Sequence, residues 1–97
     1  MKHCILVKYQ AAVDAEKRAS LPAEVRRLFA PLTTIDGIRG VEVIENVIDR
    51  PNRYDLLIRI DMEKTALPVY DESEPHRIWK RDYAGFLEKK AIFDYDD

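Results

Sequence analysis

The sequence predicts an α+β fold in which helices cover one face of an antiparallel sheet. Three observations support this prediction. Four stretches have the length and the apolar faces of strands, and apolar residues recur every three to four residues in the stretches between them. The strand-like and helix-like stretches follow one another in the order βαββαβ. The chain has 97 residues, which suits one domain with a small core, so we expect a single domain over residues 1–97.

The first strand is predicted over residues 2–9, where one face carries His3, Ile5 and Val7 and the opposite face is also largely apolar. A strand that is apolar on both faces is expected to be covered on two sides. Two more strands are predicted over 41–48 and 54–62, separated by the turn "DRPN". A final strand of about six residues is predicted within the closing "KKAIFDYDD".

The first helix is predicted within residues 14–34, where apolar residues form one stripe. Ser20 is the expected N-cap, and Pro22 is expected in the first turn, where its missing N–H costs nothing. Pro31 is expected to end or kink this helix near Ala30. The turn "IDGIRG", with its two glycines, then leads into the next strand.

The second helical region is predicted in two parts, between the third and the last strand. A short helix is expected over residues 63–71. A longer one is expected from Pro75, because Trp79, Tyr83 and Phe86 recur at helical spacing.

The predicted element order is typical of a ferredoxin-like subunit, with both helices on one face of the sheet. Two helices on one side leave the other apolar sheet face open. We therefore expect a second copy of the chain to cover that face, so that two sheets stack into a dimeric α/β barrel.

Composition excludes several classes of protein. The net charge is −2, with 16 basic and 18 acidic side chains, which argues against a general nucleic-acid surface. Cys4 is the single cysteine, so no intrachain disulfide can form, and its apolar surroundings predict a core residue. The opening apolar run is too short for a signal peptide or a membrane span. We expect a cytoplasmic protein with neither nucleic acid nor a membrane as a partner.

Several segments together resemble one known family, and the resemblance covers nearly the whole chain. They are "KHCILVKY", "DGIRGVEV", "YDLLIRID", a tyrosine followed by Pro-His, and "FLEKKAIFDYDD". In this order and spacing they are similar to the stress-responsive dimeric α/β barrel (Dabb) family. The resemblance implies a ferredoxin-like subunit, a homodimer and a link to the stress response, and it implies no single activity.

One branch of that family, the plant polyketide cyclases, shares a similar opening Lys-His, a similar ending and a tyrosine six residues before a histidine. The resemblance implies that Tyr70 and His76 form a catalytic pair and that His3 lies in the same pocket. This chain differs from the branch in the position of its proline, Pro75, and in three added carboxylates, Asp71, Glu72 and Glu74. The added charge predicts a ligand other than one with a long apolar tail.

The chemistry of the pair suits a carbonyl substrate. A histidine titrates near neutral pH and serves as a base, while a tyrosine hydroxyl stabilises a developing oxyanion. The residues expected to contact the ligand are His3, Ile5, Leu28 and Ile58. Structural roles are the alternatives: His76 in an exposed first helical turn, His3 as a buried core histidine, and Tyr70 as a packing residue between helix and sheet.

Three functions follow as hypotheses. The first is a homodimeric protein with a pocket for a small apolar or carbonyl ligand between sheet and helices. The second is a cofactor-independent cyclase or lyase acting on a polyketide-like carbonyl compound, with His76 as general base and Tyr70 as hydrogen-bond donor. The third is a haem-binding or monooxygenase-like barrel. No cofactor and no metal site is expected, since no histidine pair has ligand spacing and no Gly-rich phosphate loop is present.

Overall fold

Four antiparallel strands form one sheet in the order β2-β3-β1-β4. The strands are β1 Lys2–Tyr9, β2 Ile38–Glu45, β3 Leu56–Met62 and β4 Leu87–Tyr95. The computed structural model describes all 97 residues. The strand order places β1 at the centre, between β3 and β4, and confirms the predicted arrangement of elements.

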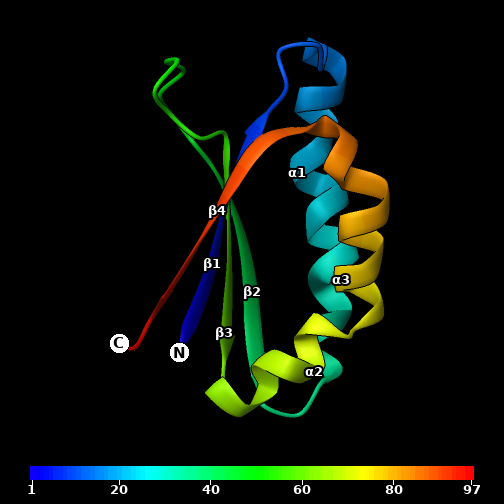
Figure 1. The fold of residues 1–97 in the computed structure, drawn as a ribbon, viewed down its shortest axis with the longest axis vertical. Coiled ribbons are helices and arrows are strands. Elements are labelled where there is room, and N and C mark those ends of the chain that lie inside the picture. The colour runs from blue at the N-terminus through cyan, green and yellow to red at the C-terminus, as the bar shows by residue number, and fades with distance from the viewer.

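The two main helical regions lie on one side of this sheet, and the short helical segment that follows β3 begins beneath its lower end (Figure 1). After β1 come α1 Ala15–Phe29 and the short 3-10 helix η1 Ala30–Thr34. Between β3 and β4 come η2 Lys64–Ala66, α2 Leu67–Asp71, α3 Glu74–Ile78, the π-helical turn η3 Trp79–Tyr83 and η4 Ala84–Phe86. No helix is both long and apolar enough to cross a membrane.

Helix α1 begins earlier than the sequence indicated. Its N-cap is Asp14, whose carboxylate accepts a hydrogen bond of 2.8 Å from the backbone N–H of Lys17. Ser20 therefore lies inside the helix, and the prediction that it is the N-cap is wrong. Pro22 also lies in the helix interior, where it leaves a carbonyl of the preceding turn without its usual N–H partner. The predicted end near Ala30 is confirmed.

The second helical region is less regular than its apolar stripe indicated. A π-helical turn and a 3-10 turn follow α3 before β4 begins at Leu87. The side chains of Trp79 and Tyr83 remain neighbours across the π turn, since their rings stack with centroids 5.6 Å apart.

The core lies between the sheet and the helices. The sheet contributes Ile5, Val7, Ile58 and Ile60, all at most 2% exposed, and helix α1 packs Phe29 against them. Strand neighbours share a face, so Ile5 lies directly between Ile58 and Ile92. His3 shares this face with Ile5 and Val7, as the sequence predicted, and so belongs to the helix-facing row.

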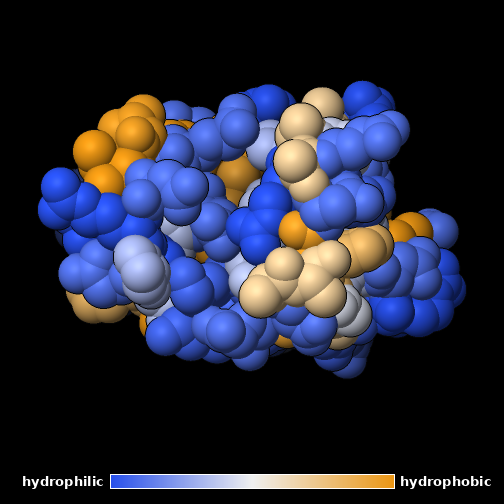
Figure 2. Space-filling model, turned by 90° about the horizontal axis from the view of Figure 1, so that it is seen from above, coloured by the Kyte–Doolittle hydropathy of each residue, from blue (hydrophilic) through white to orange (hydrophobic).

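The opposite sheet face has no helix over it. Cys4 and Leu6 of β1 point to this face, and Phe93 of β4, opposite Cys4, is 65% exposed. The loop between β2 and β3 adds Val47, which is 92% exposed. Figure 2 looks down on this end of the molecule and shows a hydrophobic patch on the side where that loop lies in Figure 1. The chain thus exposes more apolar surface on this side than scattered single residues would give.

Candidate functional site

Three rings, two from the α2–α3 segment and one from the distant strand β1, meet between these helices and the sheet. The ring of Tyr70 lies between those of His3 and His76, with centroid separations of 5.3 Å to His3 and 4.7 Å to His76. His3 comes from β1, Tyr70 from α2 and His76 from α3. The structure therefore brings the three residues predicted for catalysis and binding into one contiguous group.

The corner between α2 and α3 holds the group in place. Ser73 is the N-cap of α3, and its hydroxyl accepts a hydrogen bond from the backbone N–H of His76. The same hydroxyl donates to the backbone carbonyl of Tyr70 at 2.7 Å. One serine side chain thus fixes both members of the predicted pair relative to each other.

A backbone contact selects the tautomer of His76. Its Nδ1 lies 2.8 Å from the carbonyl oxygen of Asp71. Because a carbonyl only accepts, Nδ1 carries the hydrogen, and the neutral ring presents a free lone pair at Nε2. The His76 side chain is half-buried, so the ring that carries this lone pair is partly exposed to solvent. Such a nitrogen is suited to act as a base.

A carboxylate that the sequence did not indicate completes the group. Asp94 Oδ1 lies 2.5 Å from Nδ1 of His3, and the His3 side chain is only 8% exposed. Asp94 occupies the position of β4 directly opposite His3. The only signal for it in the sequence is its place in the "IFDY" ending. Pairing it with His3 requires the register between the first and last strands.

The hydroxyl of Tyr70 is the one buried side-chain polar atom without a hydrogen-bond partner. Tyr70 as a whole is 1% exposed. Burial raises the pKa of this hydroxyl far above its usual value, and the neighbouring Asp71 carboxylate adds to the rise. The hydroxyl therefore stays protonated near neutral pH and is available as a donor rather than as a base.

Comparisons with solved structures agree in one respect, which is the fold. A dimeric protein of unknown function from Bacteroides fragilis, described as ferredoxin-like, has a TM-score of 0.82 and 20% identity over 99% of this chain and 94% of its own. A Dabb family protein from Mesorhizobium loti, also described as ferredoxin-like, has a TM-score of 0.71 and 18% identity over 99% and 94%. A hydroxynitrile lyase from Passiflora edulis has a TM-score of 0.71 and 11% identity over 97% and 89%. No protein-family model matches the sequence, and neither does any curated protein.

The chain has a ferredoxin-like fold.

Within this ferredoxin-like fold, the other predicted ligand contacts lie in or beside the core. Ile5 and Ile58 face the helices from adjacent strands and are 2% and 0% exposed. Leu28 of α1 is partly buried against the same core. None of these three residues, and none of the His3, Tyr70 and His76 group, lines one of the five main cavities of the chain.

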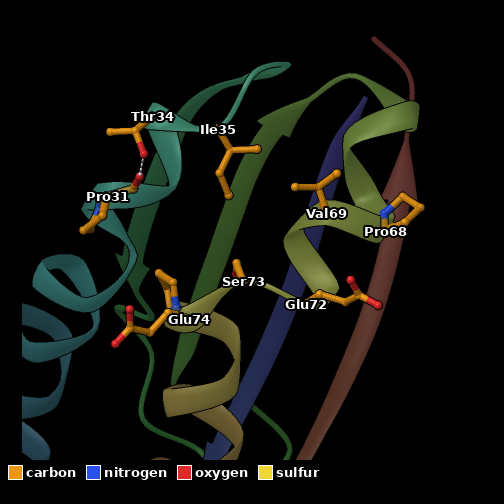
Figure 3. Close-up of a pocket in the computed structure, with 9 residues that line it drawn as sticks. Pro31, Thr34, Ile35, Pro68, Val69, Glu72, Ser73 and Glu74 are labelled. Atoms are coloured by element: carbon orange, nitrogen blue, oxygen red, sulfur yellow. Dashed lines mark hydrogen bonds between the residues drawn. The ribbon is translucent and has the colours of Figure 1, made fainter.

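The largest of the five main cavities of the ferredoxin-like chain lies beside the group instead. It has a volume of about 630 Å³ and opens between η1 and the α2–α3 corner (Figure 3). Its lining includes Pro31, Pro68, Pro75, Glu72 and Glu74. In Figure 3 the glutamates and prolines border it, and the Tyr70 and His76 rings are not among its lining residues.

Proposed function

We propose that the chain is a homodimeric protein of the stress-responsive dimeric α/β barrel (Dabb) type that binds a small carbonyl compound at Tyr70 and moves a proton on it with His76. The observation that carries the proposal is the Tyr70 hydroxyl, which is buried and unpaired on a ring that packs against two imidazoles. An unpaired buried donor costs free energy, which a ligand oxygen would recover by accepting from it.

The ligand approaches from the His76 side. Both imidazoles pack against the Tyr70 ring, but His3 is buried, whereas His76 is half-buried. A movement of the His76 ring opens the path to the hydroxyl. The catalytic constellation would then tighten only in the complex, as it does in many enzymes.

The two groups supply complementary chemistry. Nε2 of His76 takes a proton from the carbon next to the carbonyl, so that a C–H bond breaks and an N–H bond forms. The electron pair moves onto the carbonyl oxygen, and the Tyr70 O–H donates a hydrogen bond to that enolate oxygen. The enolate carbon then either attacks a second carbonyl, as in a cyclisation, or takes the proton back.

Asp94 acts as a positioning residue in this scheme. Its carboxylate accepts from Nδ1 of His3, which holds the buried imidazole against the Tyr70 ring. A fixed His3 in turn fixes where the Tyr70 hydroxyl points. That a hydroxynitrile lyase has this fold shows that the fold supports lyase chemistry, although at 11% identity it carries no residue roles.

The uncovered sheet face is the basis for proposing a dimer. Leu6, Leu57 and Phe93 form part of an apolar surface with no cover, and a second copy meeting it about a two-fold axis would bury it. The Bacteroides fragilis protein with this fold is dimeric.

The test is exchange of the methyl hydrogens of acetophenone for deuterium in heavy water, followed by proton NMR. The protein is expected to accelerate exchange over buffer alone. His76→Gln should abolish the acceleration, and Tyr70→Phe should reduce it by a factor of about ten to a thousand. Arg77→Gln, which changes an exposed neighbour in α3, is the matched control and should exchange as the wild type does. Equal exchange by the wild type and His76→Gln, with both variants folded, would remove His76 from the chemistry.

A further inference from the structure

One side of β4 faces the helices but is not covered by them. Lys90, Ile92 and Asp94 stand opposite Val7, Ile5 and His3 of β1, so the three β4 residues form one row on the helix-facing side. We call it the β4 row. Ile92, at its middle, is 50% exposed, whereas its partner Ile5 is 2% exposed. Ile92 therefore presents an apolar surface to solvent beside the core.

The two ends of the β4 row differ in chemistry. One end is Asp94, which holds His3 and through it the Tyr70 and His76 rings. The other end is Lys90, four residues away, which corresponds to about 13 Å along a strand. The row thus leads from the candidate catalytic group to a cationic side chain.

A second cavity lies at the Lys90 end. Its volume is about 380 Å³, and it is lined by Trp79, Lys80, Ala84, Leu87, Lys89 and Lys90. Trp79 is 3% exposed and follows His76 by one helical turn, so the cavity and the His76 ring lie on the same helical region. The cavity combines an apolar wall from Trp79 and Leu87 with three ammonium groups.

The lysines of this cavity have no acidic partner. The lysine ion pairs of the chain are made by Lys2, Lys17 and Lys64. Lys89 lies over the ring of Tyr54, with its Nζ 5.4 Å from the ring centroid, and so has an aromatic neighbour. Lys80 and Lys90 remain as two unpaired cations beside an apolar wall, in a chain whose net charge is −2.

We propose that the β4 row and this cavity bind a carbonyl compound that carries a carboxylate. The carboxylate lies between Lys80 and Lys90, the apolar body covers Trp79 and Ile92, and the carbonyl reaches Tyr70. The position of the carbonyl rests on the function proposed above, whereas the position of the carboxylate rests on the cavity and its lysines alone. Two unpaired ammonium groups beside an apolar wall select an amphipathic anion over a neutral ligand.

The test compares para-acetylbenzoate with para-acetylbenzamide, which has the same shape without the charge. Isothermal titration calorimetry on the wild type should show the benzoate binding about tenfold more tightly than the amide, as two exposed ion pairs allow. The double variant Lys80→Gln with Lys90→Gln should lose this preference and bind the amide as before. The control, Arg27→Gln with Lys64→Gln, removes two exposed charges elsewhere and should keep the preference.

Trp79 locates the bound compound, because it is the single tryptophan of the chain. Its indole N–H signal should shift in the nitrogen–proton NMR spectrum when the benzoate is added. An unchanged preference in the lysine double variant, or an indole signal that does not move in the wild type, would overturn the proposal. The same titration on His76→Gln separates the two proposals, since binding of the benzoate should survive even if deuterium exchange is absent in every variant.

Discussion

The carboxylate of Asp94 lies 2.5 Å from Nδ1 of His3, although 91 positions separate the two residues in the chain. This contact links the last strand to the first through side chains as well as through the backbone ladder. Asp94→Ala would leave the His3 N–H buried without a partner, which costs about 1–3 kcal/mol. We expect urea unfolding to report a loss of that size. Asp96→Ala, which removes only exposed ion pairs, is the control and should lose at most about 1 kcal/mol.

Tyr70→Phe is expected to make the unliganded protein more stable. The substitution removes a buried hydroxyl that has no partner, so the free energy of unfolding should rise by about 1 kcal/mol. The comparison is Tyr83→Phe, whose hydroxyl donates to Glu24 at 3.3 Å and whose loss should leave stability unchanged or slightly lower. Thermal or urea unfolding of both variants distinguishes the outcomes. A loss of stability in Tyr70→Phe would mean that the hydroxyl has a partner in solution.

Stability should fall in alkali because of buried tyrosines. Burial, with the Asp55 carboxylate second, raises the pKa of Tyr9 to about 12, and burial also raises the pKa of Tyr70. In the unfolded chain both ionise near pH ~10. Above that pH the native state holds protons that the unfolded state has lost. The contribution of these two tyrosines to stability is therefore complete below pH ~10 and falls by about 1.4 kcal/mol per pH unit for each tyrosine until the pH passes its native pKa.

Urea unfolding on either side of pH ~10 measures this slope. Tyr9→Phe should have a shallower decline than the wild type, because one of the two groups is gone. An equal slope in Tyr9→Phe would contradict the assignment of the effect to that tyrosine.

Phe93→Asp tests the proposed dimer. Phe93 is 65% exposed on the open sheet face, and a carboxylate there would be buried without a partner in a face-to-face dimer. The wild type should sediment as a dimer at micromolar concentration, and Phe93→Asp as a folded monomer. Val69→Asp is the matched control, because Val69 of α2 is 53% exposed on the helical side of the chain and should leave the dimer intact. A wild type that sediments as a monomer would refute the proposal directly.

The fold was largely predictable because its signals are local. The alternation of His3, Ile5 and Val7 was sufficient to predict that these three residues share one face of β1, and the register confirms it. The N-terminus of α1 could not be predicted in this way. Pro22 is typical of a first helical turn, although here the helix continues through it. Asp14 as a cap and the Lys17–Glu24 ion pair on the first turns support the longer helix.

The candidate site was predictable only in part, for a physical reason. Tyr70 and His76 are neighbours in sequence, so one short segment contains both. Asp94 meets His3 only through the pairing of the first and last strands, and residue types alone do not give that register. The Lys80 and Lys90 cavity likewise joins a helical turn to a strand, so no spacing in the sequence indicates it.

The central position of β1 also has a consequence for biosynthesis. Both of its neighbours in the sheet, β3 and β4, are translated after α1 and β2. The apolar strand β1 therefore waits for its partners until β3 and β4 have been translated. Such non-local pairing slows folding and leaves a β-prone segment open to chaperones or to other nascent chains in the meantime.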